Sequence, residues 1–562
     1  MKKKVFALLL CGLPLLTNAQ YAFDVLQMSQ TELRGTSRFQ SMAGAFGALG
    51  GDLSTLTQNP AGIGVYRNSD LGITLGLDFN STKSGVDKMN ATKFNVNNVG
   101  YVGAIRLNSE TVPNLNFGFT YNRLHSYNRH YIGGVGDIQT SMSNFIADEF
   151  VNVRGITDAD MYWTDDFNPY FDGHAPWVAI TTYDMPTNNQ GYAGIINHIP
   201  NTDDNGNEHL DGNGVSTIGS HFQGLYGNGT YGNAFYEVNE RGHADEYNIA
   251  FGGNVANKLY FGLDFGILDL DFRSDQYYRE ELNDAYVKDG EEDVLYADII
   301  NQNTRADWQL YNYKHTKGTG VNFKLGLIWR PTQALRIGAA FHTPTFYDMR
   351  VTYYVEANIK AYQDNNNLLY NATKGSNDGY DYSSNYTIST PWRFMGSVAG
   401  VIGTSGIVSL DYECVANESM RIGDDQGNNY PDATVDVKNY FKPSHIIRIG
   451  GEYRVNPNWS LRAGYSIKTS QVEQGVDKYD YNINTSDLNP AYQYDNKVHH
   501  ITCGVGYRYK SFYTDLAYVH KIRNSVYNAF SPINDEYGYE PNVSASVTDH
   551  NNRISLTLGV RF

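Results

Sequence analysis

The sequence predicts an all-β protein, a transmembrane antiparallel β-barrel of about fourteen strands. Three observations lead to this fold class. Segments of about ten residues alternate apolar and polar side chains, as strands of membrane barrels do. The connections between these segments alternate short and long, and the chain of 562 residues is rich in small and aromatic residues, with 55 Gly and 45 Tyr. Barrel walls use small residues, and their rims carry aromatic side chains.

The strand pattern is clearest at the end of the chain, where Ile554, Leu556 and Leu558 alternate with Ser555 and Thr557. A soluble sandwich also alternates, but it has no reason to keep a strict parity of short and long connections. An even number of strands places both chain ends on the periplasmic side, as an exported barrel requires. The longest outer connection spans residues 126–244. The fourteen strands are expected at residues 70–80, 94–107, 113–125, 245–257, 259–273, 315–330, 334–357, 386–402, 405–416, 440–455, 458–470, 494–509, 511–525 and 549–562.

The overall composition excludes several other classes. Hydrophobic residues make up 41% of the chain, and after the first 20 residues no apolar run approaches the roughly 18 that a spanning helix needs. The 60 acidic residues outnumber the 43 Lys and Arg, which argues against a general nucleic-acid binder. Three cysteines are too few for a disulfide scaffold.

The first residues predict export through a cleaved signal peptide, residues 1–19. A basic start at Lys2 to Lys4 precedes the apolar residues 5–16, and Thr17 and Ala19 supply the small side chains that a signal peptidase needs. The mature chain then starts near Gln20. The alternative is a lipoprotein signal that ends at Cys11, although Leu10 is large for that motif.

The mature chain loses three lysines and no acids, so its net charge changes from −17 to −20. It keeps Cys414 and Cys503, which both fall on the apolar face of their strands and are expected to act as small hydrophobic residues.

Several charged residues fall on the inward face of the predicted strands, among them Glu452, Arg561 and five further arginines. In the lumen their charges could pair with acids, whereas at the lipid midplane each would cost roughly 2–4 kcal/mol. Plain pairing with acids inside the lumen is one interpretation of these arginines, and the resemblance described below implies the other, contact with a substrate. The five further arginines are Arg336, Arg448, Arg454, Arg462 and Arg508.

The alternation slips phase in residues 267–272, where the apolar set moves from odd to even positions. This slip indicates either a β-bulge or the point where the strand leaves the bilayer.

Residues 20–69 do not alternate. They contain the small-residue run 43–51, then Asp52, and then Asn59, Pro60 and Ala61. Glycines permit backbone conformations with positive φ, and Asn-Pro favours a turn. The segment could fill the lumen as a plug, with the barrel at residues 70–562, or it could be a periplasmic tail.

With these features the chain resembles the FadL/TodX family of outer-membrane transporters for long-chain fatty acids. The resemblance begins with an apolar Phe23, residues 35–38, the run 43–51, Asp52 and the Asn59-Pro60-Ala61 motif. It continues in the barrel, at residues 327–331, 335–338, 341–344, 448–454, 461–465, 504–508 and 515–518, and at the terminal Phe562. The outer loops do not share it.

The resemblance implies a barrel closed by an N-terminal hatch, in the outer membrane of a Gram-negative cell. It implies passive uptake of small hydrophobic compounds such as fatty acids through a lumenal pocket, released by hatch movement and an opening in the wall. Its expected partners are the lipid bilayer, lipopolysaccharide and a small hydrophobic ligand, and a monomer is expected. The gate residues it implies are Asp52, Asn59, Pro60, Ala61 and Gly62, while the inward arginines could meet a carboxylate.

Two other functions stay open. The barrel could serve as a scaffold or binding protein for a surface or secretion assembly, or it could take up haem. Histidines in or beside the long outer segment make haem capture conceivable, at positions 125, 130, 174, 198, 209, 221 and 243.

No cofactor, metal site or enzymatic activity is predicted. Residues 203–214 are rich in Asp and Asn, but Glu208 stands where a calcium loop of the EF-hand type needs glycine. The sequence contains no nucleophile elbow, phosphate loop or zinc-protease motif.

Overall fold

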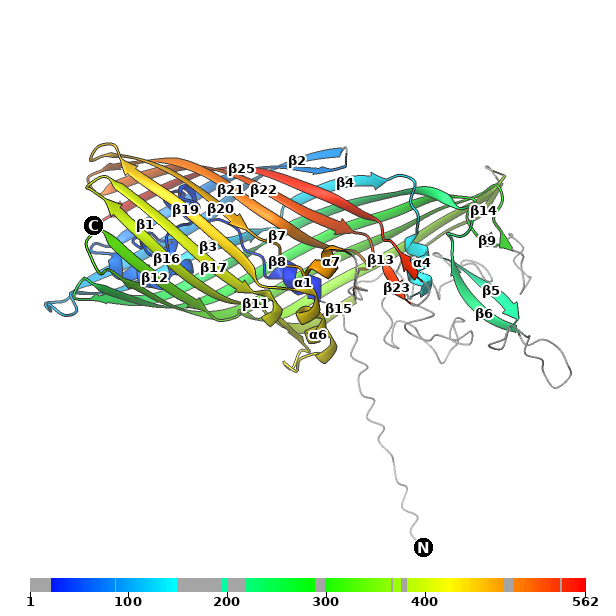
Figure 1. Ribbon diagram of the computed structural model, residues 1–562, viewed down its shortest axis with the longest axis horizontal. Helices are drawn as coiled ribbons and strands as arrows, with labels where there is room; N and C mark the ends of the chain where they lie inside the picture. The colour runs from blue at the N-terminus through cyan, green and yellow to red at the C-terminus, as the bar shows by residue number, and fades with distance from the viewer. Residues whose placement is uncertain are drawn as a thin grey trace, which may run out of the picture.

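The computed structural model describes residues 22–85, 87–148, 194–200, 218–288, 299–364, 367–375, 382–478, 483, 489–535 and 538–562. These residues form a long barrel around an N-terminal segment (Figure 1). Within the described ranges no helix is both long and apolar enough to cross a membrane.

The barrel wall is a closed ring of fourteen antiparallel strands, as predicted. The first strand pairs with the second and also with the last, so that Asp70 faces Val102 on one side and Arg561 on the other. The start of the first strand and the end of the last strand therefore lie at the same rim. The strands, in order around the wall, are β1 (Asp70–Ser84), β2 (Asp87–Arg106), β3 (Asn114–Ser126), β7 (Tyr231–Val255), β8 (Leu259–Asn283), β11 (Thr304–Trp329), β12 with β13 (Leu335–His342 and Phe346–Gln363), β16 with β15 (Trp392–Ile402 and Tyr382–Ser389), β17 with β18 (Gly406–Ala416 and Arg421–Gly423), β19 (Ser444–Arg454), β20 (Trp459–Lys468), β21 (Tyr492–Tyr509), β22 (Phe512–Asn528) and β25 (Ser544–Arg561).

The remaining elements lie beyond the long-loop rim or line it. The strand β4 extends the pairing of β7, and β14 extends the pairing of β13. These elements are β4 (Arg129–Val135), α4 (Met142–Asp148), the hairpin β5 and β6 (Gly194–Pro200 and Ile218–Gly224), β9 and β10 (Val287–Lys288 and Ile299–Ile300), β14 (Asn367–Gly375), η5 (Asn417–Ser419), α6 (Pro431–Tyr440), α7 (Gln474–Asp477), and β23 and β24 (Ile533–Asp535 and Gly538–Glu540).

The outer face of the wall is apolar where it meets lipid. On β8 the side chains of Leu259, Leu263, Phe265 and Ile267 are exposed, while Asp264 between them is buried in the lumen. A soluble protein has the reverse arrangement, with apolar side chains inside and polar side chains outside. The barrel therefore exposes many apolar residues although the mean hydropathy of the chain is negative. Cys414 and Cys503 are unpaired.

The phase slip at residues 267–272 is not a bulge. The pairing of β8 with both of its neighbours runs through this region without a register shift. Leu268 and Leu270 point inward and are buried, while Asp269 and Asp271 lie on the other face of the strand. The strand has therefore left the bilayer, and the polarity of its two faces has exchanged.

This exchange also explains why β7, β8 and β11 are longer than predicted. Above the lipid belt the strands continue around an apolar interior that includes Tyr236, Tyr278 and Trp308. Both ends of the outer connection predicted at 126–244 are consequently part of the wall, since β4 and the first part of β7 belong to it. The alternation expected of lipid-facing strands does not apply there.

Three neighbouring wall strands are interrupted at one level, which we call the seam: residues 343–345, residues 390–391 and η5. Backbone ladder bonds are replaced there by side-chain hydroxyls. The amide of Phe323 donates to Thr343 Oγ1 at 3.0 Å, and that of Thr345 donates to Thr390 Oγ1 at 2.8 Å. Pro344 and Pro391 interrupt the ladder because proline has no amide hydrogen to donate. A cavity of about 80 Å³ lies behind the seam.

The N-terminal segment, residues 22–66, lies in the lumen (Figure 1). It therefore forms a plug and not a periplasmic tail. Its elements are α1 (Ala22–Met28), α2 (Ser37–Ser41), α3 (Thr55–Gln58) and η1 (Pro60–Val65). The side chains of Met42 and Phe46 in this segment are fully buried. We call residues 22–66 the hatch.

Candidate gate and lumenal sites

The gate motif predicted from the sequence forms a compact turn of the hatch. Asn59 caps η1, because its Oδ1 accepts the amide of Ala61 at 3.1 Å, and Pro60 occupies the first position of that helix. The Asn59 side chain also donates to the carbonyl of Gly47 at 2.6 Å. It thereby joins the two halves of the hatch.

Wall glycines allow this turn to approach the barrel. A Cβ on Gly262 of β8 would overlap the Pro60 carbonyl, and one on Gly326 of β11 would overlap the Asn59 side chain. Asn59 Nδ2 reaches the carbonyl of Leu327 on the same wall strand at 3.3 Å. The turn is thus seated directly on the backbone of two wall strands.

Asp52 and Gly62 stabilise the hatch from within. Asp52 Oδ1 accepts the Thr36 hydroxyl at 2.7 Å and the amide of Ser54 at 3.0 Å. Burial raises the pKa of Asp52, which the nearby Arg38 charge opposes. The amide of Gly51, in the left-handed region at φ 69°, donates to the carbonyl of Gly62 at 3.1 Å.

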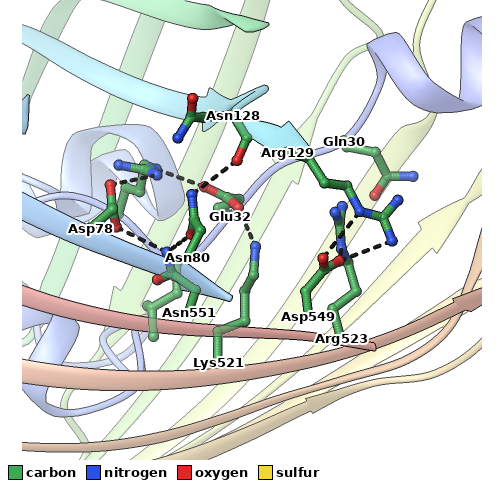
Figure 2. A network of polar contacts seen from close by, with 12 residues as sticks. Gln30, Glu32, Asp78, Asn80, Asn128, Arg129, Lys521, Arg523, Asp549 and Asn551 are labelled. Atoms are coloured by element: carbon green, nitrogen blue, oxygen red, sulfur yellow. Dashed lines mark hydrogen bonds and ion pairs between the residues drawn. The ribbon is translucent and has the colours of Figure 1, made fainter. Parts of the chain in front are cut away.

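A buried network of charges fastens the hatch to the wall (Figure 2). Glu32 of the hatch binds Lys521 of β22, and Arg34 pairs with Glu32 at 2.7 Å and with Asp78 of β1 at 3.2 Å. Arg553 of β25 completes the network through Asp78 at 2.5 Å. Burial opposes ionisation of Glu32, but Lys521 and the arginines outweigh it and hold the pKa of Glu32 well below its usual range.

A second network lies toward the short-turn rim. Arg38 of the hatch pairs with Glu452 at 2.9 Å, Glu452 with Arg462 at 2.6 Å, and Arg462 with Asp515 at 2.5 Å. These residues link the hatch to β19, β20 and β22.

The structure divides the five predicted arginines into two groups. Arg448 pairs with Glu413 at 2.5 Å, and Arg462 pairs with two acids, so plain lumenal pairing is correct for both. In the described part of the chain, Arg336, Arg454 and Arg508 have no acidic partner within 4 Å. Arg336 donates to the carbonyl of Leu49 at 2.7 Å.

These three arginines share one cavity, which we call the vestibule. It has a volume of about 620 Å³ and lies at the short-turn rim, below the hatch residues 49–53. Arg462 also lines it, whereas Arg448 lines a separate lumenal cavity of about 130 Å³ that residues 30–34 of the hatch also line. Four of the five predicted arginines therefore gather at one site.

The upper end of the hatch fills an apolar chamber of the lumen. The side chain of Phe23 in α1 contacts four rings, with centroid distances of 4.8 Å to Tyr492, 5.2 Å to Phe441, 6.0 Å to Tyr440 and 6.3 Å to Tyr494. The same cluster includes residues of β13, β15 and α6. It also buries the other apolar residues of α1, which are Ala22, Val25, Leu26 and Met28.

Sequence reasoning missed this chamber and the two charge networks. Glu32, Arg34 and Arg38 stand among polar residues with no recognisable motif, and their partners lie up to several hundred positions away in the chain. The apolar face of α1 was one available signal, since five of its seven residues are buried.

Some predicted sites fall partly or wholly outside the described residues. The Asp-rich segment 203–214 and the signal peptide belong to that part, as do His174 and His209. His125 is buried beside the ring of Tyr127, and His130 contacts Glu237 at 2.8 Å. Within the described ranges no group of three or more His, Cys, Asp or Glu side chains could hold a metal ion.

Comparisons with known proteins find one family and several solved structures that the chain resembles. Residues 242–489 match the sequence model of a family described as outer membrane protein transport protein (OMPP1/FadL/TodX). No curated protein matches the chain.

Solved structures that the chain is similar to include a FadL homologue of Pseudomonas aeruginosa, at 12% identity and a TM-score of 0.49, covering 95% of this chain and 99% of the other. The toluene transporter TbuX of Ralstonia pickettii has 14% identity and a TM-score of 0.46, covering 94% and 99%. The toluene transporter TodX of P. putida has 11% identity and a TM-score of 0.44, covering 94% and 99%.

The family is one of transport proteins and not of enzymes, in agreement with the sequence prediction. The match covers residues 242–489, and in that segment the chain is similar to the OMPP1/FadL/TodX family of outer membrane transport proteins.

Proposed function

We propose that the protein takes small hydrophobic compounds, such as long-chain fatty acids, across the outer membrane through the barrel lumen, with the hatch as its gate. It would act as a monomer in a membrane whose outer leaflet carries lipopolysaccharide. The observation that carries this proposal is the apolar chamber occupied by α1. A chamber lined by aromatic and aliphatic side chains is suited to an apolar ligand.

The chemistry of the chamber supports selectivity for hydrophobic cargo. Withdrawing α1 exposes Phe23, Val25, Leu26 and Met28, and each such side chain contributes about 1.5–3 kcal/mol when buried. A hydrophobic compound that fills the vacated space offsets this cost, whereas a sugar or an ion does not. The ligand can then shift the hatch toward an open state.

The gate role of Asp52, Asn59, Pro60, Ala61 and Gly62 is part of the same proposal. These residues hold the lower hatch against β8 and β11 through few direct bonds, of which the Asn59 contact to Leu327 is one. The gate turn therefore has a defined seat on two wall strands.

The proposal is tested by a variant that lacks residues 20–31, which removes α1 but keeps Glu32 and its bond to Lys521. In liposomes this variant should take up 1-decanol at least about tenfold faster than the full chain, because the chamber no longer has to be vacated. Arabinose uptake serves as the control for a non-specific leak and should stay unchanged.

Gln27→Ala is the matched control variant, because it removes a hydrogen bond from α1 to Glu240 while the apolar face remains. It should behave like the wild type. Equal decanol uptake by the truncated and full chains would contradict the proposal. Absence of uptake in both, with a folded barrel, would favour the scaffold function instead.

A further inference from the structure

The outward face of one flank of the wall turns from apolar to basic on the way to the long-loop rim. The strands β21, β22, β25, β1 and β2 pair in this order and lie side by side (Figure 1). Their lipid-facing positions include the exposed side chains of Phe79, Phe94, Ile501 and Ile554. The outward positions that follow toward the long-loop rim carry six basic residues, which we call the basic flank: Lys83, Lys88, Lys497, His499, His520 and His550.

Strand pairing places the three lysines in one row of the wall. Lys83 of β1 pairs with Lys88 of β2. The same row continues over β25 and β22 to Lys497 of β21. All three side chains are exposed.

The three histidines occupy the two rows next to the lysine row, on the side of the lipid-facing residues. His499 and His550 both pair with Ile522 of β22. His520 lies one row further down, and its ring is stacked on that of His550 with the centroids 5.6 Å apart. The six side chains thus form one continuous surface across five strands.

Acidic side chains are absent from this surface. On the described residues of these five strands, no outward position in the three rows is Asp or Glu, and none of the three lysines has an acidic partner within 4 Å. The chain as a whole has 60 acids against 43 Lys and Arg. The positive charge of the basic flank is therefore not used for pairing within the protein.

The flank formed by β7, β8 and β11 differs at the corresponding position. The first outward polar residues of β8 beyond its lipid-facing side chains are Asp269 and Asp271. The arginines that follow are paired with acids, since Arg273 lies 3.6 Å from Asp271 and Arg241 lies 3.2 Å from Asp275. Unpaired positive charge therefore distinguishes the basic flank from this one.

The position of the basic flank defines the chemistry of its ligand. Clusters of basic residues at the edge of a bilayer attract anionic lipid head groups. Lysine ammonium groups form charge-assisted hydrogen bonds with phosphate oxygens, and imidazole N–H groups supply further donors. The apolar side chains next to the histidines offer a surface for acyl chains. A lipid that carries more than one phosphate matches a row of three lysines better than a lipid with a single phosphate.

We propose that the basic flank is a binding site for the phosphate groups of lipopolysaccharide in the outer leaflet, with the acyl chains against Phe79, Phe94 and Ile554. This inference rests on the proposed function only in placing the barrel in a membrane that contains this glycolipid. It goes beyond lipopolysaccharide as a general neighbour of the barrel, because it assigns a site on one side of the wall.

The test measures binding of purified bisphosphorylated lipid A to the full chain in a non-ionic detergent, by native mass spectrometry. In the triple variant Lys83→Gln, Lys88→Gln and Lys497→Gln the affinity should fall at least about tenfold, because the charges that attract the phosphates are lost. The triple variant with Arg at the same positions keeps the charges and should bind like the wild type. Equal binding by the Gln variant and the wild type, both with the heat-modifiable mobility of a folded barrel, would overturn the proposal.

The matched control removes three positive charges from the other flank, through Arg241→Gln, Arg273→Gln and Lys317→Gln. Lys317 of β11 pairs with Asp271 of β8, so this flank already carries acids. The control should bind lipid A like the wild type. An equal loss of affinity in this variant would show that binding follows the net charge of the protein, and the assignment to the basic flank would be wrong.

Three further ligands distinguish the sources of phosphate. Lipid A without its phosphates should bind equally to the wild type and the Gln variant. Phosphatidylglycerol, which has one phosphate, should bind the wild type at least about tenfold more weakly than bisphosphorylated lipid A. If phosphatidylglycerol binds as tightly as lipid A, or if inorganic phosphate displaces lipid A at an equal concentration, the assignment to the glycolipid is wrong. None of these measurements involves transport, so this proposal and the proposed function can fail independently.

Discussion

At the scale of single residues, the seat of the hatch depends on glycines of the wall. Gly262→Ala places a Cβ against the Pro60 carbonyl, which is backbone and cannot rotate away. We expect this variant to loosen the hatch, with cleavage of residues 22–66 by added protease at least about tenfold faster, since about 1.4 kcal/mol of lost docking energy corresponds to that factor.

Gly400→Ala is the control for this substitution, because an added Cβ there meets no atom within 4 Å. It should leave the cleavage rate unchanged. Both variants should keep the heat-modifiable electrophoretic mobility of a folded barrel. If Gly262→Ala resists the protease as the wild type does, the turn does not depend on this close approach.

Residue-level predictions from the sequence succeeded where the local pattern determines the answer. The strand alternation placed all five arginines on the inward face, and four of them line one cavity. It could not tell paired from unpaired arginines. Arg462 meets Glu452 and Asp515 because of the pairing register of β19, β20 and β22, which the sequence of one strand does not contain.

At the scale of elements, the seam should be the weakest part of the wall. Thr390→Val removes the hydroxyl that accepts the amide of Thr345, and that amide has no ladder carbonyl to replace it. A lost hydrogen bond of this kind costs about 1–3 kcal/mol. Hydrogen–deuterium exchange of Thr345 should therefore accelerate roughly tenfold or more.

Thr387→Val, on β15 just before the interruption, is the matched control. Its hydroxyl donates to the carbonyl of Asp424, outside the pairing of β13 with β15. Exchange at Thr345 should stay at the wild-type rate in that variant. An unchanged rate in Thr390→Val would show that the hydroxyl does not support the wall.

The seam was partly visible in the sequence. Pro344 and Pro391 lie inside the segments predicted as single strands at 334–357 and 386–402, and a proline within a strand marks an interruption. The predicted number of fourteen strands did not depend on these two prolines. The replacement of ladder bonds by threonine hydroxyls could not be predicted, because it depends on how neighbouring strands align in three dimensions.

At the scale of the whole molecule, the fourteen-strand wall and the lumenal hatch follow from the sequence, while the chamber does not. Parity of the connections fixes the strand number and the position of both ends. Phe23, by contrast, finds its four aromatic partners more than 400 positions further along the chain. Only the folded barrel brings them together.

The central claim, that the hatch gates the lumen, is tested most directly by a reversible cross-link. A Cβ built on Gly47 of the hatch lies 3.0 Å from the Cβ of Ser397 on β16, about half an ångström closer than the roughly 3.5–4.5 Å that disulfides span. The variant Gly47→Cys/Ser397→Cys is made with Cys414 and Cys503 replaced by serine. Val398→Cys/Leu410→Cys joins two paired wall strands without touching the hatch and serves as the control.

The measurement is uptake of 1-decanol into liposomes before and after reduction. We expect the oxidised hatch variant to transport no faster than protein-free liposomes and to recover on reduction, while the control pair transports in both states. Undiminished uptake by the oxidised hatch variant would contradict the account, because the compound would then cross without the hatch leaving its seat.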